Sequence, residues 1–312
     1  CCTQCMITYY FRTLKDDTLK ELSELRSGVW VHAVEPTAEE LAALAVELDL
    51  DESILEDTQD FFEVPRLERV GKTVYFFTRY PFEQEAEDTE TAPLLIVLGE
   101  TFVLTVALKE VPQFKPFMSG EVVIHTTQKT NLFIQFLQVI TASFERQLIR
   151  LRRAVHKDRA RLRKIGNQEI VQFVNYEHRL NDMVAAVLPT NVALEQVING
   201  SKITIYEADR ELVDDLLIDN AQVVESARTL LRTIQNVRNA AEAILANNLN
   251  HRIKALTVLT VLLTIPTIIS SFYGMNVALP LAEEPYAFVM VLLLVLAVVG
   301  LFSWYFKKHE WF

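Results

Sequence analysis

Two long stretches near the C-terminal end of the chain carry no charged residue, and they limit the available folds more than any other feature. The first stretch runs from Ala255 to Tyr273 and the second from Tyr286 to Phe306. Crossing the roughly 30 Å of hydrocarbon in a bilayer takes about 20 helical residues. Both stretches are of about that length, so the sequence predicts two membrane-spanning helices. A pair of buried core helices is the alternative.

The connection between the two helices, residues 274–285, is too short to hold a domain, so we expect a helical hairpin. Lys and Arg concentrate in the cytoplasmic segments of membrane proteins. The basic residues that flank the two helices are Arg252, Lys254, Lys307 and Lys308. The connection holds Glu283 and Glu284 and no Lys or Arg. We therefore expect a multi-pass protein of the plasma or inner membrane, with both ends of the chain in the cytoplasm and no secretory signal peptide.

The composition excludes two other classes of protein. Half of the residues are hydrophobic, although 41 acidic and 30 basic residues give a net charge of −11. Disordered chains are poor in apolar residues, so an intrinsically disordered protein is excluded. The three cysteines all lie in residues 1–5, so a disulfide-stapled secreted domain is excluded. We interpret residues 1–5 as a tag remnant or a misassigned start, with Met6 as the initiator, in spite of their metal-like cysteine spacing.

Residues 6–126 show both strand-like and helix-like patterns. The strand-like runs are Ile7–Phe11, Val29–Val34, Thr73–Tyr80, Leu94–Leu98 and Thr101–Ala107. The helix-like segments are Thr37–Leu48 and Ser53–Gln59. Thr37 and Glu40 have the spacing of a capping box. The mixture indicates a cytoplasmic α/β domain.

From residue 127 to residue 254 the pattern is helical, which indicates a cytoplasmic stalk domain. We expect helices over 127–165, over 167–199 with Pro189 as the place where it would break, and from about 204 to 273. On the last helix an apolar stripe at spacings of three and four is broken only by Asp219. Its members are Leu212, Leu216, Val223, Ala227, Leu230, Ile234, Val237, Ala241 and Ile244. Such a narrow stripe is typical of coiled coils, so we expect this helix to pack against copies of itself and to enter the membrane.

One face of the first membrane helix carries hydroxyl groups at spacings of three and four. Its members are Thr257, Thr260, Thr264, Thr267 and Ser271, and the face continues back to Ile253 and Asn250. At 100° per residue the five hydroxyls fall within an arc of roughly 80°. Single hydroxyls in membrane helices often bond only their own backbone, but five on one arc favour contact with water. Two helices cannot enclose water, so we expect several subunits to form a pore that this helix lines, with the second helix facing lipid.

The first membrane helix ends in the string Tyr273-Gly274-Met275-Asn276. In this place, at the outer end of the first of two C-terminal helices, the string resembles the signature of the CorA family of magnesium transporters. With the α/β domain and the long stalk, the resemblance covers essentially the whole chain. It implies a funnel-shaped homopentamer whose first membrane helices line the pore.

The resemblance also implies roles for single residues. A ring of Asn276 side chains would bind hydrated Mg²⁺ as the selectivity filter, and Gly274 and Met275 would hold the turn that aims it. Counting back along the helix places an inner asparagine ring at Asn250 and a hydrophobic constriction at Ile253 and Leu256. Glu283 and Glu284 would concentrate cations at the outer mouth, although the loop after Asn276 departs from the segment usual in the family.

Transport in this family implies Mg²⁺ both as cargo and as regulator. A divalent cation gains about 4.6 kcal/mol per 100 mV of membrane potential, so uptake needs no ATP. Mg²⁺ bound between cytoplasmic domains would hold the pore closed, and the candidate stalk acids are Asp214, Asp215 and Asp219. Counting back from the Gly-Met-Asn triplet without gaps, the resemblance places Asp215 at the position of an acidic residue that the family carries on its stalk helix. Residues 35–63 add 11 acids and no Lys or Arg, and carboxylates across a subunit boundary repel unless a cation screens them.

The sequence leaves the transported metal open. Relatives of the ZntB branch carry the same triplet and move Zn²⁺, so transport of Zn²⁺, Co²⁺ or Ni²⁺, coupled to protons or not, is the alternative. A non-conducting receptor or scaffold would not need the hydroxyl face. The six histidines are scattered and no catalytic or cofactor motif stands out, so we predict no enzyme activity. The basic run between Arg146 and Lys164 lacks stacking aromatics, so we predict no nucleic-acid binding.

Overall fold

The computed structural model describes residues 6–83, 89–160, 167–199, 203, 205–277, 285–309 and 311. The chain divides into two compact units, Cys1–Asn236 and Val237–Phe312. One long helix, α6 (Glu207–Tyr273), contributes residues to both units. The predicted tag remnant, residues 1–5, and the predicted outer-mouth acids, Glu283 and Glu284, lie outside the described residues.

The first unit contains a seven-stranded mixed sheet with the strand order β2-β1-β3-β7-β6-β5-β4. The strands are β1 (Met6–Phe11), β2 (Lys20–Leu22), β3 (Val29–Val34), β4 (Arg66–Val70), β5 (Thr73–Glu83), β6 (Thr89–Leu98) and β7 (Phe102–Ala107). Neighbouring strands are antiparallel except for β3 and β7, which are parallel. The five strand-like runs of the sequence are confirmed as β1, β3, β5, β6 and β7.

The two strands that the sequence patterns did not reveal, β2 and β4, are the edge strands of the sheet. Lys20 and Glu21 of β2 and Arg69 of β4 are exposed. Charged side chains on an edge strand oppose pairing with a strand of another chain. The same charges remove the apolar alternation by which a strand is identified, and this explains why both strands were missed.

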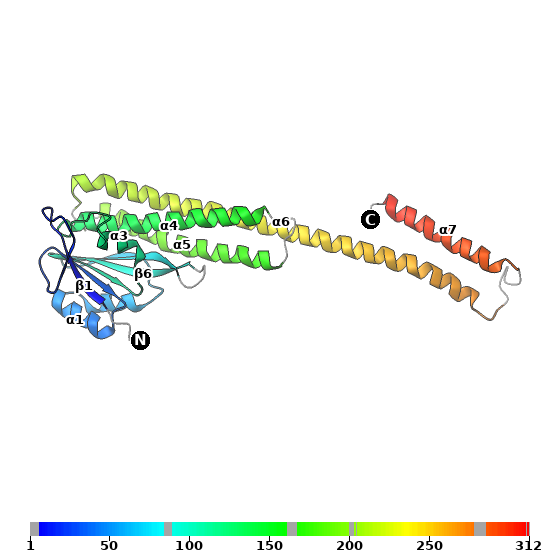
Figure 1. The fold of residues 1–312 in the computed structure, drawn as a ribbon, viewed down its shortest axis with the longest axis horizontal. Helices are drawn as coiled ribbons and strands as arrows, with labels where there is room; N and C mark the ends of the chain where they lie inside the picture. Colours follow the sequence, from blue (N-terminus) through cyan, green and yellow to red (C-terminus); the bar gives the residue numbers. More distant parts are fainter. Residues whose placement is uncertain are drawn as a thin grey trace. The chain divides into compact units, whose positions relative to one another are not determined.

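Helices α1 (Ala38–Leu48) and α2 (Glu52–Glu56) cover one face of the sheet (Figure 1). Leu41 and Leu44 of α1 belong to a buried cluster that includes Val31 of β3. The predicted capping box is confirmed: the backbone N–H of Glu40 donates to Thr37 Oγ1 at 3.3 Å, and the backbone N–H of Thr37 donates to the Glu40 carboxylate at 2.9 Å. This cap fixes where α1 begins.

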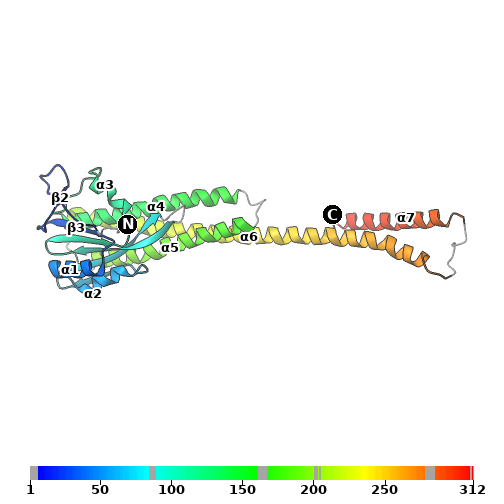
Figure 2. The same ribbon diagram turned by 60° about the horizontal axis from the view of Figure 1, so that its bottom comes forward.

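The opposite face of the sheet is covered by longer helices (Figures 1 and 2). The helical segments on this side and at its edges are η1 (Asp57–Gln59), η2 (Pro112–Phe114), α3 (Lys115–Met118), α4 (Lys129–Arg159) and α5 (Asn167–Asn199). The ring of Phe136 on α4 lies 4.9 Å from that of Trp30 on β3. The hydroxyls of Thr78 on β5 and Thr190 on α5 are hydrogen-bonded at 3.0 Å. The mixed α/β fold is therefore confirmed, and its sheet is buried on both faces.

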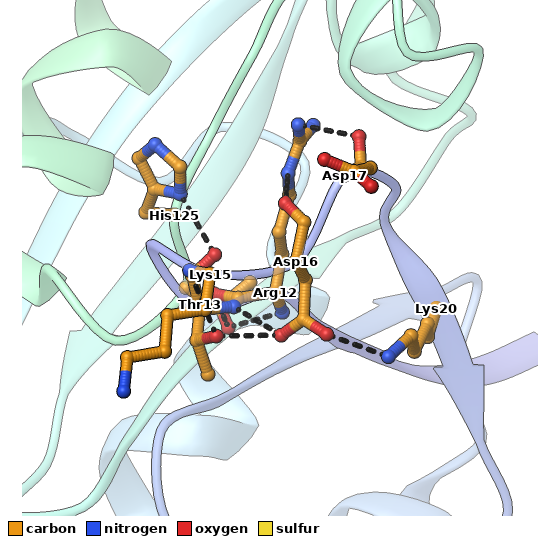
Figure 3. A network of polar contacts seen from close by, with 8 residues as sticks. Arg12, Thr13, Lys15, Asp16, Asp17, Lys20 and His125 are labelled. Carbon is orange, nitrogen blue, oxygen red and sulfur yellow. Dashed lines mark hydrogen bonds and ion pairs between the residues drawn. The ribbon is translucent and has the colours of Figure 1, made fainter.

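A polar network ties the loop after β1 to the segment before α4 (Figure 3). The buried Arg12 donates from Nε to the carbonyl oxygen of Asp16 at 3.2 Å. His125 Nδ1 lies 3.2 Å from the carbonyl oxygen of Thr13. The Asp16 carboxylate accepts from Lys20 and from the Thr13 hydroxyl, both at 2.6 Å, and these bonds hold the pKa of Asp16 well below its usual range. The network fixes the start of α4 against the sheet.

One titratable side chain, His32, lies inside the aromatic core on the α4 side of the sheet. Its ring stands 5.4 Å from that of Trp30 and 5.7 Å from that of Phe114. His32 Nδ1 and Trp30 Nε1 both lie within 2.9 Å of the Thr105 hydroxyl. Burial lowers the pKa of His32 to about 4, because the apolar surroundings disfavour the charged imidazolium.

The buried His32 should make the first unit less stable in mild acid. The unfolded chain binds a proton near pH 6.5, whereas the folded chain binds one only near pH 4, so stability is lost as pH falls between these values. We expect a loss of about 2 kcal/mol by pH 5. It can be measured by chemical unfolding of the full-length protein, with Trp30 fluorescence as the probe in a Trp304→Phe, Trp311→Phe background.

The matched variants for this measurement are His32→Gln and His178→Gln, the second of which removes an exposed histidine from α5. His32→Gln cannot titrate, so this part of the pH dependence should disappear, while His178→Gln should keep it. An unchanged pH dependence in His32→Gln would contradict the assignment.

The helices of the stalk answer one open question and correct one expectation. Helix α5 passes through Pro189 without a break. The apolar stripe of α6 is not free for other copies in the first unit, because Leu216, Val223, Ala227, Leu230 and Ile234 are all buried within the protomer. Two hydrogen bonds join α4 to α6 on this side, from Asn131 to Asp209 at 2.9 Å and from Thr141 to Asn220 at 2.8 Å.

The expectation that Asp219 interrupts the apolar stripe is wrong. Asp219 is exposed, and the neighbouring Asn220 is buried in the stripe, where Thr141 satisfies its side-chain oxygen. Packing within the same chain avoids the entropy lost on association, and α4 reaches this side of α6 through its two hydrogen bonds.

The second unit contains the C-terminal part of α6 and helix α7 (Ala287–Lys308). Both views show α7 running antiparallel to the end of α6 (Figures 1 and 2). The predicted hairpin is confirmed. The last turn of α7 is basic and aromatic: Lys308 Nζ lies 5.2 Å from the centre of the Trp304 ring, and the Tyr305 and His309 rings are 4.5 Å apart.

Candidate functional site

The end of α6 and the whole of α7 expose apolar side chains. Both helices are long and apolar enough to cross a membrane, and only 6% and 0% of their most apolar segments are buried. Leu256 and Leu263 of α6 are 64% and 63% exposed. A core helix would be mostly buried, so the alternative of two buried core helices is wrong. Exposed apolar surface of this extent needs lipid or another subunit to cover it.

The four threonine hydroxyls of the predicted pore face are bonded to their own helix, and their side chains are exposed. Each of the four threonines donates to the carbonyl oxygen four residues earlier, at 2.7–3.0 Å: Thr257 to Ile253, Thr260 to Leu256, Thr264 to Thr260 and Thr267 to Leu263. The four side chains and Ser271 are nevertheless exposed. Because each hydroxyl has one hydrogen and that hydrogen is used, the exposed oxygen acts only as an acceptor. The face is therefore lined by hydrogen-bond acceptors.

The string at the end of α6 forms a tight turn. The backbone N–H of Gly274 donates to the carbonyl oxygen of Ser270 at 2.9 Å, and that of Met275 donates to Phe272 at 3.2 Å. A Cβ atom on Gly274 would lie 3.3 Å from the Ser270 oxygen, so glycine relieves a close approach. Asn276 follows the turn and is exposed. Asn276 therefore lies just beyond the helix end.

The inner end of the predicted pore face is also exposed. Asn250, Ile253 and Leu256 all lie on the open surface of α6. No side chain of the face, from Asn250 to Ser271, is buried in the structure. The sequence thus identified a face that the single chain leaves uncovered.

The predicted regulatory acids do not form a metal site within the described residues of one chain. Asp214, Asp215 and Asp219 are exposed on α6. Among the described residues, no three His, Cys, Asp or Glu side chains are grouped closely enough to hold a metal ion. A regulatory site that uses these acids would therefore need ligands from a second subunit or from outside the described residues.

The structure places further residues on the open side of α6 that the sequence patterns did not single out. In the first unit the exposed face is centred on Ile218, Glu225 and Arg232, which are seven residues apart, and Ile218 is 63% exposed. The spacing of seven was present in the sequence. Only the burial of the opposite side of α6 by α4 reveals which of the seven positions is open.

The comparisons with known proteins agree over both units. Residues 26–308 match the family model of the CorA-like Mg²⁺ transporter protein. The cobalt/magnesium transport protein CorA of Methanocaldococcus jannaschii is 23% identical over 290 residues, which cover 91% of each chain. The complete structure of the CorA magnesium transporter from that organism has a TM-score of 0.87 at 20% identity, over 98% of this chain and 99% of that chain.

A likeness of fold extends to a second known protein. The cytoplasmic domain of ZntB from Vibrio parahaemolyticus has a TM-score of 0.63 at 8% identity, over 78% of this chain and 99% of that chain. At this identity the likeness concerns the fold alone. The family match, in contrast, runs from the sheet through both apolar helices and includes the Tyr273–Asn276 turn. The chain therefore belongs to the CorA-like Mg²⁺ transporter family.

Proposed function

We propose that this protein takes up Mg²⁺ across a cell membrane through a pore formed by five copies of the chain. The observation that carries the proposal is the face of α6 on which four threonine oxygens are exposed while their hydrogens are bonded to the helix. Membership of the CorA-like family supports Mg²⁺ as the cargo and a homopentamer as the assembly. The basic ends of the helices support an orientation with both termini in the cytoplasm.

The repeat of seven along α6 supports a pore made of several copies of this helix. Steps of seven from Ile218, Glu225 and Arg232 lead to Asn239, Ala246, Ile253, Thr260 and Thr267. The last three belong to the face that the sequence analysis predicted to line the pore. Helices that keep a seven-residue face coil around one another with a slight left-handed twist. A seven-residue series of exposed positions on α6 is what a bundle of α6 helices around an axis requires.

The acceptor face suits a cation that keeps its water. Mg²⁺ gives up its water reluctantly and usually retains several molecules. Those waters point their hydrogens outward, so a wall of fixed acceptors binds them without replacing them. Thr257, Thr260, Thr264 and Thr267 would accept from this hydration shell along the membrane, and the amide oxygen of Asn276 would do so at the outer end. Gly274 and Met275 would hold the turn that aims Asn276.

The two ends of the pore would have different roles. Glu283 and Glu284 would attract cations at the outer mouth, while Asn250, Ile253 and Leu256 would narrow the inner end.

Acidic residues of the stalk would regulate the flow of cations. In the assembled pore the exposed Asp214, Asp215 and Asp219 would face a neighbouring subunit. Their mutual repulsion would favour separation of the stalks, and bound Mg²⁺ would cancel it. Cytoplasmic Mg²⁺ would then close the pore.

Uptake by the full-length protein in liposomes tests the proposal. With an inside-negative potential, Mg²⁺ should enter without ATP, and the rate should rise with the potential because a divalent ion gains about 4.6 kcal/mol per 100 mV. Zn²⁺, Co²⁺ and Ni²⁺ are measured in the same preparation. The double variant Thr260→Val, Thr264→Val keeps the side-chain shape, removes two acceptors and should slow uptake.

Three outcomes would contradict the proposal. Uptake equal to that of empty liposomes would favour a non-conducting receptor. Zn²⁺ uptake that follows a proton gradient and ignores the potential would favour the proton-coupled alternative. Unchanged Mg²⁺ uptake in the valine variant would remove the hydroxyl face from the mechanism.

A further inference from the structure

The charge on the open face of α6 changes sign along the stalk. Residues 207–225 of this helix are rich in acids, whereas residues 226–241 contain three arginines and no acid. Those arginines are Arg228, Arg232 and Arg238. Arg232 is exposed at the centre of the open face, seven residues from Glu225. In the first unit the open face of α6 therefore carries a positive charge next to a negative one.

Within the part of the chain that the structure describes, neither charge is neutralised by an ion pair. Among the described residues, no ion pair joins Glu225 or Arg232 to a partner. Seven residues of helix separate the two Cα atoms by about 10.5 Å, which is too far for a close pair. Many exposed arginines are only solvated. Arg232 differs because its position belongs to the seven-residue series that continues to Ile253, Thr260 and Thr267.

We propose that Arg232 sets the rate at which Mg²⁺ passes the cytoplasmic part of the cation path. The inference rests on the proposed pore, in which five copies of Arg232 surround the axis and five copies of Glu225 form the next ring. The arginine ring repels cations. The repulsion energy is twice as large for a divalent cation as for a monovalent one, because it is proportional to the charge of the ion. The Glu225 ring has the opposite effect on the same ions.

The test compares the full-length protein with single variants in liposomes, by the initial rate of Mg²⁺ uptake at a fixed potential in low and in high KCl. Arg232→Gln should raise uptake severalfold in low salt and less in high salt, because salt screens the ring in the parent protein. Arg232→Lys keeps the charge and should resemble the parent. Glu225→Gln should lower uptake. Arg152→Gln removes an exposed arginine from α4 and should change nothing.

The outcomes separate this inference from its alternatives. If Arg232→Gln and Glu225→Gln shift uptake in the same direction, the two residues act by holding subunits together, and the inference is wrong. It is also wrong if Arg232→Gln equals Arg152→Gln, or if Arg232→Lys raises uptake as Gln does. Absence of uptake in the parent protein would instead overturn the proposed function. Elution as the same oligomer on size-exclusion chromatography shows that each variant is folded and assembled.

Discussion

Replacing Asn276 with Ala should reduce Mg²⁺ uptake at least about tenfold and lower the preference for Mg²⁺ over Co²⁺ and Ni²⁺. Asn276 follows the turn in which the backbone N–H groups of Gly274 and Met275 bond back to α6, so the residue lies at the helix end. A hydrogen bond to a charged group contributes roughly 1.5–3 kcal/mol, and 1.4 kcal/mol is a factor of ten. Initial rates of uptake in liposomes, measured for each metal, give both quantities.

The matched control is Asn181→Ala, which removes an exposed amide from α5 in the first unit. It should transport like the parent protein. Gly274→Ala tests the turn separately, because its Cβ would press on the Ser270 carbonyl oxygen while Asn276 is retained. We expect a partial loss from this variant. If Asn276→Ala transports Mg²⁺ with the parent's rate and preference, the filter lies elsewhere.

The second large effect concerns closure by cytoplasmic Mg²⁺. Asp215→Lys should make uptake nearly independent of the Mg²⁺ concentration inside the liposome. Asp215 is exposed on α6 beside Asp214 and one turn from Asp219. A lysine removes one ligand for the divalent cation and also supplies a positive charge in its place, so bound Mg²⁺ no longer changes the balance of repulsion. The ratio of uptake rates at low and high internal Mg²⁺ is the measurement.

Glu121→Lys makes the same change of charge sign at an exposed site outside α6 and should keep the parent's ratio. Asp214→Asn and Asp219→Asn remove one charge each, and we expect smaller reductions of the ratio. Closure by Mg²⁺ that stays normal in Asp215→Lys would exclude this residue from regulation, while the transport proposal would be unaffected.

Local patterns were sufficient for the parts of the fold that depend on local chemistry. The capping box of Thr37 and Glu40 and the five apolar strands are confirmed because alternation and cap spacing act over a few residues. The edge strands β2 and β4 were missed because their charged residues have no such pattern. For Pro189 the sequence left a helix interruption open. Helix α5 continues through this residue, because the missing hydrogen bond costs less than giving up the packing of α5 on the sheet.

The long stripe of α6 shows why a pattern can be recognised and its partner mistaken. Leu216 to Ile234 have the spacing of a coiled coil, and that spacing is compatible with a second copy or with another helix of the same chain. Hydrogen bonds from Asn131 and Thr141 of α4 show that this side of α6 packs against another helix of the same chain. The partner of an apolar face depends on which segments meet in three dimensions, and the spacing of one helix does not contain this information.

The sequence by itself determined the two apolar helices, the hydroxyl face and the Tyr273–Asn276 string, because helical periodicity and the absence of charge are properties of a single segment. The tertiary structure alone decided which side of α6 is open. Helix α4 buries the Asn220 side of α6 and leaves Ile218, Glu225 and Arg232 exposed. Burial is a property of two packed surfaces, so the open face became visible only when α4 was in place.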